Sequence, residues 1–128
     1  MLYPVCRTKI KGGIVTDKNL YYDGSITISN NILEAAEIKP GDMVEVLNLN
    51  NGARVTTYVI KGKENSGEIC LNGPAARFFE IGDQIIILSV CLVTDDERKK
   101  LKMRLVSLTD RNLTIKVEGN NARNEEND

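Results

Sequence analysis

Tyr21-Tyr22-Asp23-Gly24-Ser25-Ile26 is the stretch around which the rest of the chain is organised. Asp-Gly-Ser between apolar residues is typical of a turn, because Asp hydrogen-bonds its own downstream backbone and Gly accepts a positive φ. Residues 25–28 alternate between polar and apolar side chains, so we expect a surface turn that leads directly into a short strand.

The segments around this turn read as short elements with frequent turn residues. Upstream, residues 3–16 predict one or two strands broken at Gly12-Gly13, and residues 17–23 predict a loop. Downstream, the expected elements are a helix over 31–37 capped by Ser29 or Asn30 and ended by Pro40-Gly41, strands over 43–49, 53–60 and 68–71, a helical turn over 74–79, a strand over 84–94, a weak helix over 95–102, and strands over 104–108 and 113–117.

Two of these segments carry the clearest signals. Asn50-Asn51-Gly52 predicts a hairpin, because Asn and Gly both tolerate a positive φ. The nearly continuous apolar run over 84–94 predicts a strand covered on both faces. Many short strands with two or three brief helices indicate a mainly β fold, a small closed barrel over residues 1–117 as one domain. From residue 118 the chain is acidic with almost nothing apolar, and we expect a disordered tail over 118–128.

Composition excludes several classes of function. Of the 128 residues 41% are hydrophobic and 27% charged, as in ordinary soluble proteins, and the net charge of −1 gives no basic field for nucleic acid or an anionic membrane. The longest apolar run is too short to span a bilayer, so a cytoplasmic protein is the simplest interpretation. The chain has no histidine, which excludes Ser-His-Asp and Cys-His catalysis. Its three cysteines include no C-x-x-C pair, so we expect neither a disulfide framework nor a metal site.

Further motifs accompany the turn in a characteristic order: Lys9 before it, then Asn51-Gly52-Ala53-Arg54-Val55-Thr56-Thr57-Tyr58 and Leu71-Asn72-Gly73-Pro74-Ala75-Ala76. In order and spacing, this set resembles the pyruvoyl-dependent aspartate decarboxylases, which make β-alanine for pantothenate synthesis. The resemblance covers about residues 1–117. It implies a double-psi β-barrel, a homotetramer with active sites between subunits, and self-cleavage between Gly24 and Ser25.

The chemistry of that reaction explains why a serine would be consumed. Decarboxylation leaves an electron pair on Cα, and a carbonyl cofactor that condenses with the substrate amine accepts it. The chain shows no phosphate cup for pyridoxal phosphate, whereas a pyruvoyl group can be made from the chain itself. If Ser25 attacks the Gly24 carbonyl, the resulting ester eliminates to dehydroalanine, which hydrolyses to pyruvoyl and ammonia.

The resemblance implies a role for each residue of the constellation. Ser25 is the nucleophile that becomes the pyruvoyl and forms the Schiff base, Thr57 donates to the oxyanion during processing, and Tyr58 protonates the product carbanion. Arg54 and Lys9 bind the two carboxylates of aspartate, in an order that the sequence leaves open. Asn72 serves processing and binding, and the remaining binding positions are Tyr22, Thr57, Gly73, Pro74 and Ala75.

Three positions depart from the family pattern: Lys11 stands where a His or similar residue is expected, Leu47 where some members carry Trp, and Pro74 where Ala is expected. Pro74 removes one N–H that could face the substrate. Two other functions remain open, a non-catalytic β-barrel that binds a partner and stays uncleaved, and a pyruvoyl decarboxylase for another acidic amino acid such as glutamate. The sequence also leaves open whether a helper protein triggers cleavage.

Overall fold

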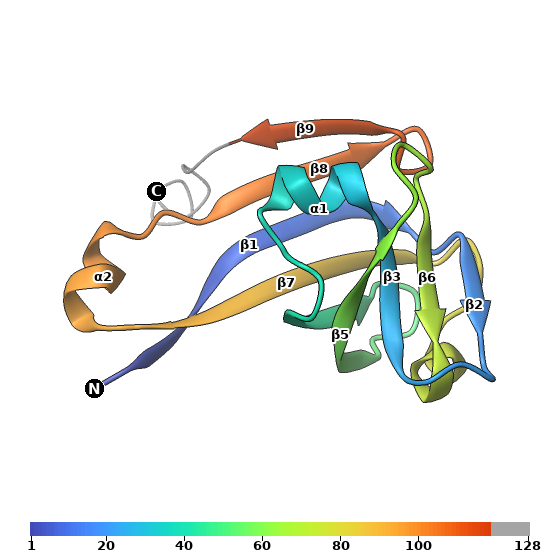
Figure 1. The fold of residues 1–128 in the computed structure, drawn as a ribbon, viewed down its shortest axis with the longest axis horizontal. Helices are drawn as coiled ribbons and strands as arrows, with labels where there is room; N and C mark the ends of the chain where they lie inside the picture. The colour runs from blue at the N-terminus through green and yellow to red at the C-terminus, as the bar shows by residue number, and fades with distance from the viewer. Residues whose placement is uncertain (119–128) are drawn as a thin grey trace.

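The structure, a computed structural model, describes residues 1–118. Within these residues the fold is mainly β, as predicted (Figure 1). The helical elements are α1 (Asn30–Ala36), the 3₁₀ turn η1 (Gly73–Phe78) and α2 (Asp95–Lys100). The strands are β1 (Tyr3–Ile14), β2 (Asp17–Asn19), β3 (Ser25–Ser29), β4 (Met43–Asn48), β5 (Arg54–Gly62), β6 (Ile69–Asn72), β7 (Gln84–Val93), β8 (Arg104–Thr109) and β9 (Thr114–Glu118).

The strands form one sheet in the order β2-β6-β3-β5-β4-β7-β1-β8-β9. β2 stands at one end of this order, yet it follows β1 after only Val15 and Thr16. β1 lies between β7 and β8, whereas β2 pairs in parallel with β6. At the junction, the Thr16 N–H donates to the carbonyl of Ile69 at 2.9 Å. The continuous chain from β1 to β2 therefore brings distant parts of the strand order together, which is compatible with a double-psi β-barrel.

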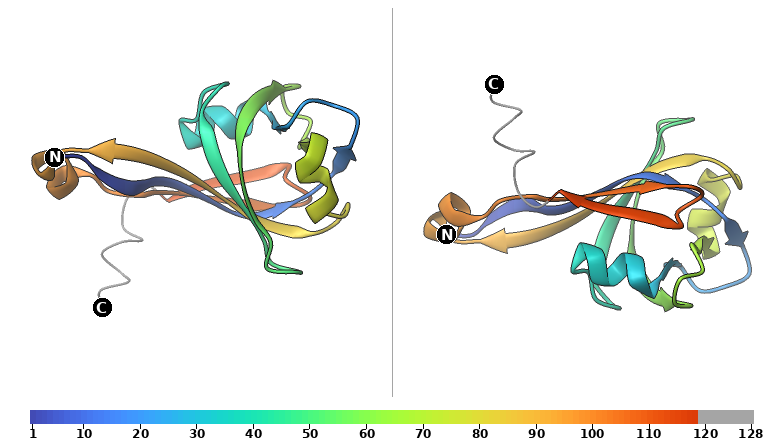
Figure 2. Two further views of the ribbon diagram at one scale, coloured as in Figure 1. Left: turned by 90° about the horizontal axis from the view of Figure 1, so that it is seen from below. Right: turned by 90° about the horizontal axis from the view of Figure 1, so that it is seen from above.

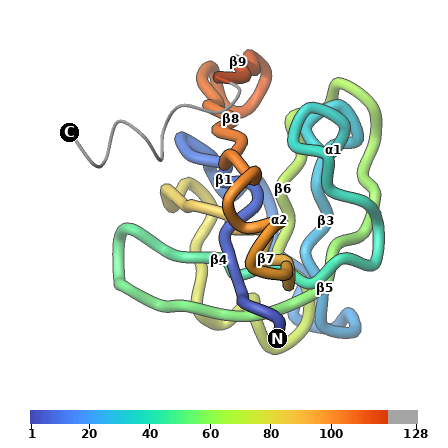
Figure 3. Tube along the Cα trace, turned by 90° about the vertical axis from the view of Figure 1, so that its left-hand side faces the viewer, coloured from blue at the N-terminus to red at the C-terminus, as the bar shows by residue number. Residues whose placement is uncertain are grey.

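The core lies on the inner face of this curled sheet: alternate residues of β4 and of the first part of β7 are buried, and all four residues of β6 are buried. α1 lies next to β3, with the β8–β9 hairpin on its other side (Figure 3), and adds Ile32, Leu33 and Ala36 to the core. Full burial of such side chains stabilises a fold by about 1.5–3 kcal/mol each. The strands contribute Ile10, Ile26, Ile28, Val44, Val46, Val59, Ile69, Leu71, Ile85, Ile87, Val106 and Leu108.

β1 is one strand of 12 residues and is not broken at Gly12-Gly13. Its pairing with β7 is irregular between Ile10 and Gly13, so the glycines bend the strand without ending it. Gly12 has φ +78°, and a Cβ there would lie 2.3 Å from the carbonyl oxygen of Leu108. Glycine is therefore required for β1 to approach β8 at this point.

Two local predictions need correction. The expected loop over 17–23 begins as β2, because Asp17 and Asn19 pair with residues of β6 that are distant in sequence. α1 starts at Asn30 with Ser29 at the N-cap position, but the Ser29 hydroxyl makes no capping hydrogen bond. It donates instead to the carbonyl of Lys63 at 2.9 Å, which ties the start of α1 to the turn after β5.

The hairpin prediction is confirmed: β4 and β5 pair in antiparallel register around the turn at Asn51-Gly52, where Gly52 has φ +77°. The helix predicted over 95–102 forms as α2, with a capping box between Thr94 and Glu97. β9 ends at Glu118, one residue beyond the expected domain boundary, and the remaining tail over 119–128 lies outside the described residues. No helix within residues 1–118 is long and apolar enough to cross a membrane.

β1 and β7 run together beyond the rest of the sheet as a long arm that ends at α2, beside the N-terminus (Figures 1 and 2). The prediction that this apolar segment of β7 is covered on both faces is wrong for the single chain. Ile85 and Ile87 are buried, whereas Val90 and Leu92 are 42% and 62% exposed. One face of β7 packs on the core, and the other presents apolar side chains to solvent.

Candidate active site

The expected cleavage site lies where an exposed segment enters a buried strand. Tyr22 and Asp23 are exposed, Gly24 is half-buried, and Ser25, the first residue of β3, is fully buried. The expectation of a serine on a surface turn is therefore wrong. Ser25 is buried because β3 pairs with β6 from its first residue, with Ser25 opposite Asn72.

The Asn72 side chain contacts Ser25 directly. Its Nδ2 donates to Ser25 Oγ at 2.8 Å and to Thr27 Oγ1 at 3.0 Å. Its Oδ1 accepts a hydrogen bond from the Cys70 thiol at 3.3 Å. Asn72 is only 4% exposed, so these contacts are shielded from water. The structure thus brings together two of the expected site residues, Ser25 and Asn72, and adds Thr27 and Cys70.

Sequence reasoning missed Cys70 and Thr27 as neighbours of the site. One signal was available, because Cys70 and Asn72 are two residues apart on a strand and therefore share a face. No such signal was available for Thr27. It comes to lie opposite Cys70 only through the pairing of β3 with β6, which the sequence does not show. Burial, and secondarily the negative charges of Asp17 and Glu68, raise the pKa of the Cys70 thiol to about 11.

Gly73 lies against the backbone of residues 22–24, which precede Ser25. It has φ +69°, and a Cβ there would lie 2.6 Å from the carbonyl oxygen of Tyr22 and 2.8 Å from the Gly24 nitrogen. Gly24 itself is not among the glycines of positive φ. The positive φ expected at Gly24 is therefore found at Gly73 instead. Pro74, at the start of η1, has its Cδ 3.9 Å from the position of a Cβ on Gly24.

The register of β3 with β5 places Thr57 and Tyr58 relative to the cleavage site. These strands are parallel, with Ile26 level with Val59. The pairing ends at Ile26 and Val59, so Ser25 with Tyr58, and Gly24 with Thr57, are the positions one and two residues before the first pair. Successive residues of a strand point to opposite faces, so Tyr58 shares the outward face with Ser25. Thr57 is 8% exposed and Tyr58 38%, in agreement with that alternation.

The two expected carboxylate-binding residues also lie on the outward face of the sheet, Arg54 on β5 and Lys9 on β1. Arg54, at the start of β5, has a side chain that is 52% exposed and contacts Glu45 at 3.4 Å. Lys9, in β1, is half-buried and lies level with Leu88 of β7. Three strands, β5, β4 and β7, stand between β1 and β3 in the sheet order. Lys9 and Ser25 thus lie on strands that are not neighbours in the sheet order.

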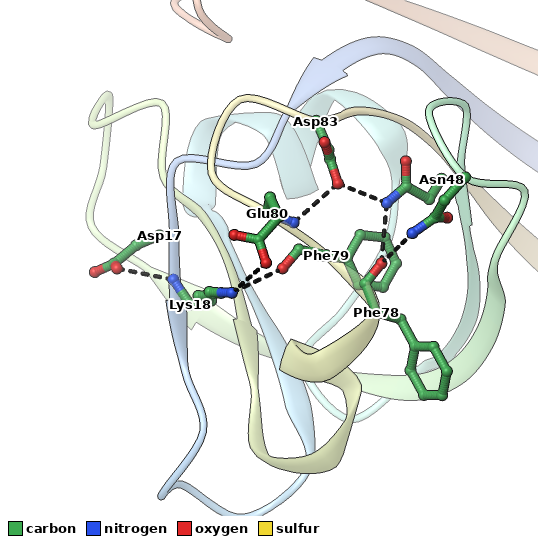
Figure 4. Close-up of polar contacts among 8 residues, drawn as sticks. Asp17, Lys18, Asn48, Phe78, Phe79, Glu80 and Asp83 are labelled. Atoms are coloured by element: carbon green, nitrogen blue, oxygen red, sulfur yellow. Dashed lines mark hydrogen bonds and ion pairs between the residues drawn. The ribbon is translucent and has the colours of Figure 1, made fainter.

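The polar network of Figure 4 fixes the elements that flank the site. Lys18 of β2 donates from Nζ to the carbonyl of Phe79 at 3.2 Å and to Glu80 at 2.8 Å. Asn48, at the end of β4, donates from Nδ2 to the carbonyl of Phe78 at 3.0 Å and to Asp83 at 2.7 Å. The end of η1 is thus tied both to β2 and to β4, which limits movement of the segment from Asn72 to Phe79.

Known proteins resemble this chain over almost its whole length. A family model described as aspartate decarboxylase matches residues 1–116. A relative named aspartate 1-decarboxylase from Francisella tularensis subsp. novicida is 53% identical over 108 residues, which cover 84% of this chain and 96% of that protein. Relatives of the same name from Kosmotoga olearia and Thermoanaerobacter pseudethanolicus are 50% and 47% identical, over 85% and 87% of this chain and 93% and 95% of their own lengths.

Proposed function

The chain belongs to the aspartate decarboxylase family and is a carboxy-lyase that converts aspartate to β-alanine and CO₂; we propose that it does so with a pyruvoyl group made from its own Ser25. The observation that supports this proposal is the hydrogen bond from Asn72 Nδ2 to the buried Ser25 Oγ, next to Gly24. A serine that merely filled a turn would need neither burial nor a dedicated donor.

In the proposed self-processing, Ser25 Oγ attacks the carbonyl carbon of Gly24, and the C–N bond breaks to give an ester and a free amine. Asn72 donates to the attacking oxygen as its negative charge develops. Thr57, like Gly24 two residues before the first pair of β3 with β5, supplies the hydroxyl for the oxyanion on the Gly24 carbonyl oxygen. Loss of the Ser25 α-proton then breaks the Cβ–Oγ bond and releases residues 1–24 with a carboxylate terminus. Water finally replaces the nitrogen on residue 25, which leaves as ammonia.

The surroundings of Ser25 suit a pyruvoyl group. The position is shielded from water, a side-chain N–H points at it, and Gly73 leaves no side chain between η1 and the segment over 22–24. When present, the group supplies the carbonyl that condenses with the substrate amine and accepts the electron pair left by CO₂. Tyr58, on the same face and like Ser25 one residue before the first pair of β3 with β5, is the proposed proton donor to the carbon that loses CO₂.

Substrate binding requires a second chain in this proposal. Arg54 and Lys9 are the cations available for a dicarboxylate, and Arg54 is exposed beside the apolar outward face of β4 and β7. In the proposed homotetramer, Lys9 and Ser25 of one site come from different subunits, which is compatible with β1 and β3 not being neighbours in the sheet order. A homotetramer with sites between subunits would also cover Met43, Val90 and Leu92. We place the enzyme in the cytoplasm, where it acts in pantothenate biosynthesis.

Intact mass measurement tests the proposal. The wild-type chain should separate into residues 1–24 and 25–128, and the larger fragment should be one ammonia lighter than the same fragment with an N-terminal serine. Ser25→Ala should remain a single inactive chain. An intact wild-type chain that decarboxylates aspartate without added cofactor would refute the mechanism. Prolonged warming before a second measurement separates slow maturation from none.

A further inference from the structure

Four polar side chains meet where β3 pairs with β6, and we call them the Asn72 cluster: Ser25, Thr27, Cys70 and Asn72. Ser25 lies opposite Asn72, and Thr27 lies opposite Cys70. The Asn72 amide is central, because it donates to both hydroxyls and accepts from the thiol. Cys70 is 7% exposed, and it has no role in the proposed reaction.

The two hydroxyls determine only weakly which end of the Asn72 amide faces Ser25, because the other acceptor for the Ser25 hydroxyl, the Asp23 carbonyl, is at 3.5 Å. A hydroxyl both donates and accepts, so Ser25 and Thr27 could bind the amide nitrogen or, after rotation by 180°, the amide oxygen. A thiol is weak both as a donor and as an acceptor, but within residues 1–118 the Cys70 S–H has no acceptor closer than the Asn72 amide atom that faces it. At 3.3 Å from Cys70 Sγ, an amide oxygen is therefore favoured over an amide nitrogen.

The thiol keeps the proton that this contact requires. Burial raises the pKa of Cys70 to about 11, so the group is neutral throughout the physiological range. The other acceptor near Sγ, the carbonyl of Leu71, is at 4.0 Å, so the hydrogen is directed to Asn72 Oδ1. Asn72 Nδ2 is then left to face Ser25 and Thr27.

We propose that Cys70 is a positioning residue, which holds the Asn72 amide with its N–H₂ toward Ser25 and thereby promotes self-processing. This inference rests on the proposed function, because it names how a donor to the attacking oxygen is oriented. With the amide reversed, an oxygen with partial negative charge would face Ser25 Oγ at about the same distance. It would oppose the charge that develops there and would hold the hydroxyl hydrogen.

The test compares side chains at position 70 that differ in their ability to donate. Purified precursor is incubated, and the cleaved fraction is followed by intact mass. Cys70→Ala should cleave about three- to tenfold more slowly, as expected for the loss of one hydrogen bond. Cys70→Ser, which keeps a donor, should recover most of the rate. Cys91→Ala removes a thiol from β7, away from the cluster, and should leave the rate unchanged.

A double-mutant comparison separates positioning from a structural role. In an Asn72→Ala background, Cys70→Ala should cause no further loss of cleavage rate, because its effect passes through the amide. Equal losses in both backgrounds, or a Cys70→Ala rate equal to wild type, would overturn the inference and leave the proposed function intact. A wild-type chain that never cleaves would overturn both. If Cys70→Ala fails to fold, Cys70→Val replaces it, since valine also lacks a donor.

Discussion

Replacement of Gly73 by alanine would place a methyl group against the backbone that carries the cleavage site. The added Cβ would lie 2.6 Å from the Tyr22 carbonyl oxygen, 2.8 Å from the Gly24 nitrogen and 2.9 Å from the Gly24 Cα. An ordinary contact distance of 3.4 Å requires a displacement of up to 0.8 Å, the difference between 3.4 and 2.6 Å. All three atoms belong to the backbone, so no side chain can rotate away.

The expected effect has two parts. A non-glycine residue in the left-handed region costs about 1–2 kcal/mol, and overpacking adds roughly 1–3 kcal/mol to the loss of folding stability. The Gly24 atoms would shift by up to 0.6 Å, the difference between 3.4 and 2.8 Å. Since a misplacement of about 1 Å costs about 10²-fold, this shift should slow processing by roughly tenfold. The assay is the rate of appearance of the 1–24 fragment by mass, together with the thermal unfolding midpoint of the uncleaved chain.

Gly52→Ala is the matched control. Gly52 has a similar φ of +77°, but a Cβ there would meet nothing within 4 Å. It should lose stability through backbone strain alone and cleave at the wild-type rate. If Gly73→Ala cleaves as fast as Gly52→Ala, the segment over 22–24 relaxes freely and the reasoning is refuted.

Three further predictions concern the other residues of the site. Thr57→Val should slow cleavage by about 10²–10³-fold, because it removes the oxyanion donor. Tyr58→Phe should cleave normally and fail to release β-alanine. Normal maturation of Thr57→Val, measured by intact mass, would contradict the role assigned to Thr57. Arg54→Lys should lower kcat/KM for aspartate by the equivalent of roughly 1.5–3 kcal/mol, because an ammonium does not bind a carboxylate bidentately; an unchanged kcat/KM would remove Arg54 from the site. The Cys70 thiol should resist iodoacetamide at pH 8.5, because its pKa is raised from 9.0 to about 11 and little thiolate forms; peptide mapping that shows Cys70 labelled as readily as in the unfolded chain would contradict this.

The raised pKa of Cys70 also makes the folding stability depend on pH. Between about pH 9 and 11 the unfolded chain has lost the thiol proton while the folded chain keeps it, so the unfolded state binds fewer protons. The contribution of this group to stability is thus fully present below pH 9 and decreases as the pH rises through that window. Cys70→Ser has no thiol to titrate at position 70, so its stability should decrease less than that of the wild type between about pH 9 and 11.

Local sequence signals predicted the elements of this fold well. Asn51-Gly52 correctly indicated the β4–β5 hairpin, although only Gly52 of the two residues adopts a positive φ. β2 could not be predicted, since Asp17–Asn19 becomes a strand only through pairing with β6. The same limit applies to the exposed side of β7, where Val90 and Leu92 were expected to be buried but are 42% and 62% exposed in the described chain.

The candidate site likewise contains residues that the sequence reveals and contacts that only the folded sheet creates. Ser25, Asn72 and Gly73 could be found from the sequence because the motifs carry them together. The burial of Ser25 and the contacts of Cys70 and Thr27 depend on the register between β3 and β6, which is a property of the folded sheet. Gly24 was expected to carry the unusual backbone conformation, but the close approach of η1 places that requirement on Gly73.

The passage of one segment from β1 to β2 has a consequence for the enzyme after cleavage. Residues 1–24 would no longer be joined to the rest of the chain, yet they would supply β1 between β7 and β8 and β2 beside β6. The small fragment would be held as a structural subunit, and it would not be lost as a propeptide is. Unfolding would then release two molecules, and refolding would follow mass action and slow down on dilution. Self-processing would thus add a concentration-dependent association step to the refolding of each subunit of the proposed homotetramer.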